Sequence, residues 1–319
     1  MSGPSDQPTP DLEPLEDETP GDVTPSGGAG ETIPPRRQSL FSPRATVSWF
    51  STRLDLDPVL ALLRRKPVPI HRHSWIYCLG DAAVFLFAVQ AATGLLLMLY
   101  YQPTEAAAHE SVRRIATEVP FGWLIRSMHA WGASLFLLVV GLHLATVLFA
   151  RAYRRPRELV WISGVFMLCV AMGSGFSGYL LPWTELSYFA TRVGTQIPGK
   201  LPWIGPGLVH LLRGGEQLTG ETITRFFAAH VALAPLAMFL LLGIHVFLSR
   251  VRGVSLPAGL TRRDVRDSRP FFTEFLLIDL CVWLVLLGAI VTLAVVQPAG
   301  IGAKANPLHP APEGIKPEW

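Results

Sequence analysis

The stretch FGWLIRSMHAWGASLFLLVVGLH, residues 121–143, decides the fold. It is apolar over a length that can cross a bilayer, for which about 20 helical residues suffice, yet it carries His129 and His143. Imidazoles inside a membrane are costly, and by default they indicate function. The two histidines are 14 positions apart, which in an α-helix means about 21 Å of rise and about 320° of rotation. The stretch therefore predicts a membrane-spanning helix that presents two histidines on one face at two depths.

A second apolar stretch repeats this arrangement with His230 and His245, which are 15 positions apart, about 22 Å along a helix. Pro235 lies between them and can kink the helix. Both stretches cross in the same direction, so His129 matches His230 in depth and His143 matches His245. Two facing pairs about 20 Å apart suit two bis-histidine haems. A zinc site would need three or four ligands close together, whereas a lone membrane histidine is often a hydrogen-bonded packing residue.

Glycines provide an independent indication on two further apolar stretches. Gly80 and Gly94 are 14 positions apart, as are Gly164 and Gly178. Small residues in membrane helices permit close approach. Ordinary helix packing would use them too, but the shared period of 14 favours flat haem groups seated against these helices at both depths.

Composition indicates an integral membrane protein, since half of the 319 residues are hydrophobic and 16% are charged. Backbone polar groups in lipid must be satisfied within the segment, so apolar segments of this length are helices. The predicted fold is an all-α membrane protein, a four-helix haem-binding bundle with a fifth transmembrane helix. The predicted spans are roughly 76–101, 123–149, 159–181, 227–249 and 275–297.

Four regions follow one another along the chain. We expect a disordered tail over residues 1–45, which are rich in Pro, Gly, Ser and acids, and an interfacial amphipathic helix over 46–70. The bundle occupies 71–250, and the fifth helix with its following loop occupies 251–319. The segments on the N-terminal side hold 18 Lys and Arg residues against 9 on the other side. This bias predicts a cytoplasmic N-terminus and a C-terminus on the opposite face.

Cysteine and arginine positions allow more than one interpretation. The chain has three cysteines and no CxxC or CxxCH motif, which excludes a disulfide framework, a zinc clip and an ordinary c-type haem motif. Cys78, at the start of the first span, has no cysteine nearby. Arg126 and Arg225 precede His129 and His230 and could pair with haem propionates, or serve as interfacial charges.

Four stretches together resemble the cytochrome b family of quinol:cytochrome c oxidoreductases: residues 121–143, SGFSGYLLPW (174–183), LTGETITRFFAAHVALAPL (218–236) and PEW (317–319). The resemblance covers about residues 49–319. It implies quinol oxidation at the outer face, with Glu318 as proton acceptor, and electron transfer through two b haems to an inner quinone site. It also implies proton translocation, a homodimeric complex, a Rieske iron–sulfur protein and a c-type cytochrome as partners.

The cytochrome b6 type is the closest likeness, extended by one helix similar to the first helix of that type's separate subunit IV. The 15-residue histidine spacing, YYQPT (100–104) and RRPRELVWISGV (154–165) carry it. This likeness implies a haem c bound to Cys78 by one thioether, Arg250 near that haem and the inner quinone site, and a separate subunit with the remaining helices. The inner acid of that type has no counterpart here, and Asp81 and Asp279 are candidate substitutes for proton entry. A bacterial cytoplasmic membrane is expected, and no nucleic-acid partner.

Two other functions remain open at this point. A di-haem membrane anchor could conduct electrons for a dehydrogenase, although such an anchor needs neither the PEW segment nor a docking loop for a Rieske protein. A haem-free transporter could use the histidines as a proton relay, and it would lack haem absorbance bands.

Overall fold

The structure is a computed structural model. It describes residues 74–253 and 276–308, together with residues 49, 53, 68–70, 267–269, 310–311 and 314. Residues 1–55 and 56–319 form two units, and the first is described only at Trp49 and Arg53, whose guanidinium carbon lies 4.2 Å from the Trp49 ring centre. The predicted tail, most of the predicted interfacial helix and Glu318 lie outside the described residues.

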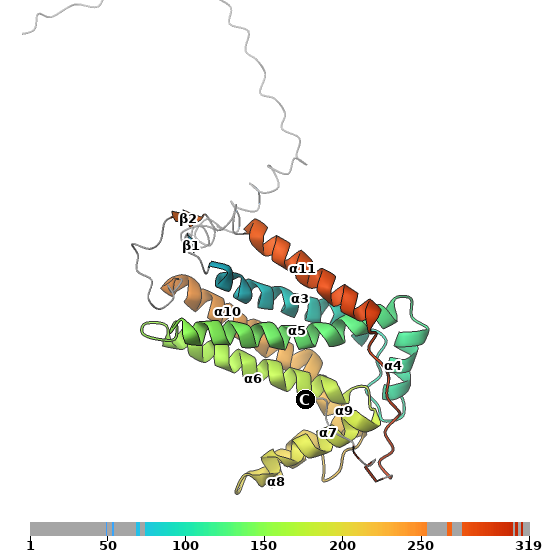
Figure 1. Ribbon diagram of the computed structural model, residues 1–319. Helices are drawn as coiled ribbons and strands as arrows, with labels where there is room; N and C mark the ends of the chain where they lie inside the picture. The colour runs from blue at the N-terminus through green and yellow to red at the C-terminus, as the bar shows by residue number, and fades with distance from the viewer. Residues whose placement is uncertain are drawn as a thin grey trace, which may run out of the picture. The chain divides into compact units, whose positions relative to one another are not determined.

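Five helices of the described chain are long and apolar enough to cross a membrane. They are α3 (Cys78–Met98), α5 (Gly122–Phe149), α6 (Glu158–Leu180), the continuous run from Gly220 to Arg252, and α11 (Leu276–Val296). Figure 1 shows them side by side. The predicted all-α membrane fold is confirmed. The fourth span begins at Gly220 rather than near 227, because the polar turn GETITR is already helical, as α9.

The helices pack as two pairs with one covering helix. α3 packs against α5, α6 packs against α10 (Ala234–Arg252), and α11 lies against both α3 and α5. Leu86, Val139 and Ile290 meet in a buried cluster among α3, α5 and α11. Apolar side chains also cover the outside of the bundle, as a lipid environment requires. Leu95, Phe166 and Leu240 are 60%, 59% and 61% exposed.

Short elements connect the spans, and the sequence did not predict them as helices. A 3-10 turn, η1 (Ser74–Tyr77), leads into α3. At the other end of the bundle lie α4 (Ala108–Thr117), α7 (Glu185–Gln196), η2 (Pro198–Lys200) and α8 (Gly205–Arg213). Two three-residue antiparallel strands, β1 (Val68–Ile70) and β2 (Asp267–Arg269), complete the described elements.

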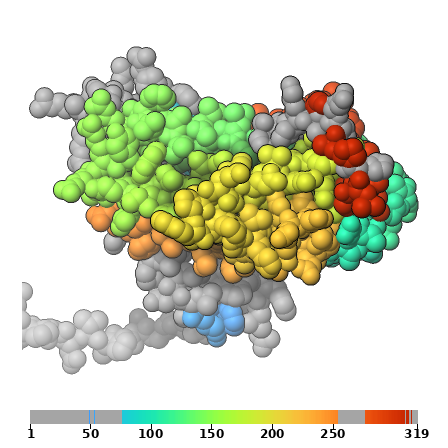
Figure 2. Space-filling view, turned by 90° about the horizontal axis from the view of Figure 1, so that it is seen from below, coloured from blue at the N-terminus to red at the C-terminus, as the bar shows by residue number. Residues whose placement is uncertain are grey.

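The segment after α11 is held across the end of the bundle that carries α4 and α7. The amide of Glu185 donates to the Ala303 carbonyl over 2.8 Å, and the amide of Ala305 donates to the Trp183 carbonyl over 3.0 Å. His109 in α4 hydrogen-bonds the Gly302 carbonyl over 2.9 Å. Figure 2 shows this segment (red) beside α4 (teal). The chain after the fifth helix therefore lies against the turn between α6 and α7.

Candidate functional site

His129 on α5 and His230 on the fourth span face each other, and we call them the first pair. Their ring centroids are 6.1 Å apart, with an angle of 83° between the ring planes. Zinc–imidazole bonds are about 2.0–2.1 Å long, and with bonds of similar length two rings at this separation would both reach a metal ion between them. The separation of the first pair therefore fits a shared iron between the rings.

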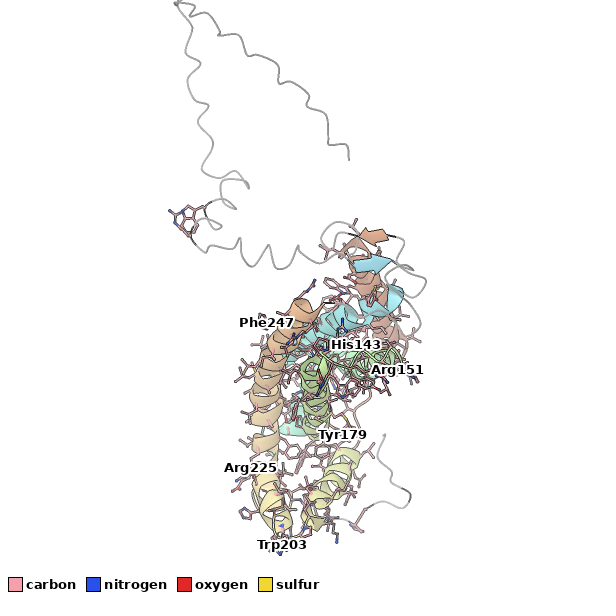
Figure 3. The ribbon with its side chains drawn as sticks, turned by 90° about the vertical axis from the view of Figure 1, so that its left-hand side faces the viewer. His143, Arg151, Tyr179, Trp203, Arg225 and Phe247 are labelled. Atoms are coloured by element: carbon pink, nitrogen blue, oxygen red, sulfur yellow. The ribbon has the colours of Figure 1, made fainter. Side chains whose placement is uncertain are left out.

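His143 and His245 form the second pair, one level further along the same helices. They lie close enough to interact electrostatically. Figure 3 places His143 among the helices, away from the end marked by Arg225 and Trp203. Among the described residues, no group of three or more His, Cys, Asp or Glu side chains could hold a metal ion. The two pairs thus have the ligand number of bis-histidine haem and not that of a zinc site.

A π-helical turn aligns the histidines of the fourth span. Fourteen residues of α-helix end about 40° short of four full turns, and fifteen end about 60° past them. The span is α-helical in α9 (Gly220–Ala228) and α10, but η3 (Ala229–Leu233) between them is a π-turn that begins beside His230. A π-turn takes up an extra residue, so the 15-residue spacing here acts like the 14-residue spacing on α5. The π-turn ends at Leu233, two residues before Pro235, where the sequence predicts that the helix can kink.

Each of the four glycines lies against one histidine ring. A Cβ placed on Gly94 would be 3.2 Å from Cε1 of His129, and one on Gly178 only 2.5 Å from Cε1 of His230. At the second level, Gly80 faces His143 at 3.4 Å and Gly164 faces His245 at 3.2 Å. The structure thus brings the predicted glycines to the levels of the two pairs, with α3 behind the histidines of α5 and α6 behind those of the fourth span.

Hydrogen bonds hold the Nδ1 side of three of these rings. The His230 Nδ1–H donates to the Ser174 carbonyl over 2.8 Å, because a carbonyl can only accept. The Thr93 hydroxyl lies 2.9 Å from Nδ1 of His129, and the Ser163 hydroxyl 2.9 Å from Nδ1 of His245. A proton fixed on Nδ1 leaves the lone pair of Nε2 free to bind a metal. The donor set therefore fits haem iron.

The predicted arginines have backbone partners. Arg126 donates to the carbonyls of Ala299 and Gly300 over 2.5 and 2.6 Å, and so ties α5 to the segment after α11. Arg225 donates to the Leu211 carbonyl over 2.6 Å. Their proposed pairing with haem propionates remains a prediction.

Cys78 lies in a buried acidic cluster at the start of α3. The cysteine is 8% exposed and packs against Tyr77, Ile278 and Val282. Its side chain interacts electrostatically with that of Asp279 on α11. The Asp279 side chain, 2% exposed, also interacts with Asp81, which in turn interacts electrostatically with Arg250.

This cluster lies near the second pair, because Asp81 follows Gly80, which abuts His143. The structure therefore places Cys78, the two candidate acids and Arg250 together.

The opposite end of the bundle carries the region expected to bind quinol. Trp183 is fully buried there, next to Tyr188. Tyr101, just past α3, donates its hydroxyl to the Leu181 carbonyl over 2.8 Å. Burial raises the pKa of the Tyr101 phenol, so the phenol keeps this proton at neutral pH. The turn at 181–185 is thereby fixed from two sides, by Tyr101 and by the segment at 303–305.

The family model described as cytochrome b/b6/petB matches residues 63–253. The chain belongs to the cytochrome b family. It is 46% identical over 277 residues to the cytochrome b subunit of a cytochrome bc complex from Chlorobaculum thiosulfatiphilum, which covers 86% of this chain. It is 41% identical over 212 residues to the cytochrome b6 of Heliobacterium mobile, covering 66% of this chain and 100% of that protein.

A solved structure of a hyperthermophilic respiratory complex III contains a chain similar to this one. The TM-score is 0.73 and the identity 32%, over 86% of this chain and 74% of that chain. Our chain spans 64% of the length of the Chlorobaculum protein. Membership of the cytochrome b family implies haem b binding, and the four histidines are the residues that fit it.

Sequence reasoning missed the hydrogen-bond partners of the histidines and the π-turn. Thr93 and Ser163 gave a usable signal, since each directly precedes a glycine of the predicted pattern. The Ser174 carbonyl gave none, because any residue offers a carbonyl and only the fold determines which one meets His230.

Proposed function

We propose that the chain is the cytochrome b subunit of a proton-translocating quinol:cytochrome c oxidoreductase of the bc or b6f type in a bacterial cytoplasmic membrane. The observation that carries this proposal is the arrangement of four histidines at two levels. A glycine lies against each of the four rings, and Nδ1 of three of the rings has a hydrogen-bond partner. The N-terminus would be cytoplasmic, which places the first pair near the outer face and the second pair near the inner face.

In this function the two histidine pairs have the same role at two different depths. Bound haem supplies reversible one-electron chemistry. His129 and His230 would hold one b haem, and His143 and His245 the other. Because the rise from His129 to His143 is about 21 Å, the two levels would carry charge across most of the membrane. The apolar side chains of the bundle keep water away from the path.

We propose that quinol is oxidised at the outer face, near the turn at 181–185 and the segment after α11. The hydrogen bonds of Glu185 and Ala305 support this position, because they bring the chain leading to Glu318 toward that turn. Glu318 would accept a quinol proton. Glu318→Gln should slow quinol oxidation while both b haems stay bound.

Proposed partners are a Rieske protein, a c-type cytochrome, a further subunit and a second copy of the complex. The names of the relatives support this, since the Chlorobaculum protein is described as a subunit of a cytochrome bc complex. The test is to add quinol to membranes that contain the complex and to follow the b haems and the Rieske centre together. Reduction of both supports the proposal, whereas reduction of the b haems alone would favour a di-haem anchor for a dehydrogenase.

A haem c attached to Cys78 is the finer part of this proposal. One thiol can add to one haem vinyl group, so no CxxCH motif is needed. Cys78→Ala should abolish the haem stain of the 35 kDa band on a denaturing gel while both b haems remain in the spectrum. Cys281→Ala, which removes an exposed cysteine of α11, is the matched control. An unstained wild-type band would refute the attachment.

Proton entry to the inner quinone site is proposed to use Asp81 and Asp279. Asp279→Asn should slow reoxidation of the b haems by quinone about a hundredfold, because loss of a positioned proton donor costs about 10²–10⁴-fold. Reduction by quinol at the outer face should be unchanged. Glu158→Gln, at an exposed carboxyl of α6, is the control. Wild-type reoxidation in Asp279→Asn would contradict this role.

A further inference from the structure

Hydroxyl residues precede three of the four glycines that face the histidines. The pairs are Thr93–Gly94, Ser163–Gly164 and Ser177–Gly178, and the fourth pair is Leu79–Gly80. Positions 79 and 93 are 14 apart on α3, and positions 163 and 177 are 14 apart on α6. Each of these two helices therefore has one such position at each of the two histidine levels. Leu79 is the exception, and it lies at the level of His143.

The hydroxyl groups of Thr93 and Ser163 already donate their hydrogens to backbone carbonyls. Thr93 donates to the Val89 carbonyl over 2.7 Å, and Ser163 donates to the Val160 carbonyl over 2.9 Å. A hydroxyl has one hydrogen to donate, so its oxygen must accept from the imidazole Nδ1–H. These two residues therefore fix the tautomer of His129 and His245.

The first pair has the stronger set of partners. His230 donates to the Ser174 carbonyl, and the Ser177 hydroxyl donates to that same carbonyl over 3.0 Å. Both rings of the first pair thus have an acceptor at Nδ1. In the second pair only His245 has one, since Nδ1 of His143 is buried and has no hydrogen-bond partner in the described part of the chain.

An acceptor at Nδ1–H makes the imidazole a better electron donor to iron through Nε2. A better donor stabilises the oxidised iron and lowers the reduction potential, which hydrogen bonding around haem is known to tune. The missing acceptor at His143 acts in the opposite direction. A haem held by the second pair would thereby have a higher reduction potential than one whose two ligands both had an acceptor.

We propose that the residue preceding each glycine tunes the haem at its level, and that Leu79, by offering His143 no hydroxyl, raises the reduction potential of the second haem. This inference rests on the haem binding proposed above. Thr93, Ser163 and Leu79 act as positioning residues, through the histidines.

The test compares reduction potentials in two variants that differ by one group. Leu79→Thr and Leu79→Val have side chains of nearly the same shape, but only threonine can accept from His143. We expect Leu79→Thr to lower the potential of the second haem relative to Leu79→Val, by about a tenfold change in the one-electron reduction equilibrium, which is about 59 mV. Leu95→Thr, which adds a hydroxyl at a 60% exposed position one residue after Gly94, should move neither haem.

The reciprocal change is made at the first level. Thr93→Val should raise the potential of the first haem, and Thr93→Ser should retain the wild-type value. Ser163→Ala should raise the potential of the same haem that Leu79→Thr lowers. Potentiometry of the complete complex, followed by the b haem absorbance, resolves the two haems as separate steps.

Equal potentials in Leu79→Thr and Leu79→Val, with both haems bound, would overturn the inference, as would an unmoved first haem in Thr93→Val. If Thr93→Val loses its haem, the Leu79 variants decide alone. A wild-type complex without two b haems would contradict the proposed function instead, so the two failures are distinguishable.

Discussion

Leucine in place of His245 is expected to remove one of the two b haems and to leave the other bound. Each iron depends on two imidazoles from different helices, and loss of even a hydrogen-bond partner of a metal ligand costs about 10–100-fold in affinity. Loss of the ligand itself should cost more. Because the levels are about 21 Å apart, the haem of the first pair should keep its spectrum. The measurement is the reduced-minus-oxidised spectrum of purified complex together with its haem content.

The partner variant makes this result specific. His143→Leu should lose the same haem as His245→Leu, whereas His129→Leu and His230→Leu should both lose the other one. His210→Leu, at an exposed histidine of α8, should lose neither. Loss of a different haem in His143→Leu than in His245→Leu would contradict the pairing.

Alanine at Gly178 is expected to displace the first haem. Its Cβ would lie 2.5 Å from Cε1, 2.9 Å from Nδ1 and 3.1 Å from Nε2 of His230. The ring cannot retreat easily, because its Nδ1 is bound to the Ser174 carbonyl of the same helix α6. We expect loss of most of the first haem, measured as haem per chain, while the second haem remains.

Gly288→Ala on α11 is the matched control, since a Cβ there would meet nothing within 4 Å. It should keep both haems, because alanine also favours helix over glycine by up to about 1 kcal/mol. Gly80→Ala should be milder than Gly178→Ala, because its Cβ would have 3.4 Å to the nearest ring atom. Full haem content in Gly178→Ala would show that the close approach is not needed.

Much of the bundle could be predicted because few backbone conformations satisfy their own hydrogen bonds in lipid. Long apolar runs must be helices, and a histidine in such a run stands out. The period of 14 shared by His129–His143 and by the two glycine pairs then predicted the two levels. The short helices α4, α7 and α8 were missed because they lie outside the apolar runs, where weak amphipathic patterns carry the only signal.

The fourth span shows where helical arithmetic fails. A spacing of 15 in a regular helix would rotate His245 by about 100° relative to a spacing of 14. The π-turn at Ala229–Leu233 absorbs the difference. No residue type in its sequence, AHVAL, indicates a π-turn. The predicted pairing therefore depends on a backbone irregularity that the sequence did not predict.

The buried cluster at the start of α3 was equally hard to foresee. Cys78, Asp81 and Asp279 come from two helices far apart in the sequence, and only the packing of α11 on α3 brings them together. From the sequence, each of the three residues was a candidate on its own. Their interactions with one another follow from the fold.

Haem b stoichiometry of the purified chain in its complex tests the central claim most directly. A pyridine haemochrome spectrum measures haem b independently of its axial ligands, and amino-acid analysis measures the chain. We expect two haem b per chain in the wild type, and one in His245→Leu. A wild-type value of one or none would contradict the assignment of two bis-histidine sites.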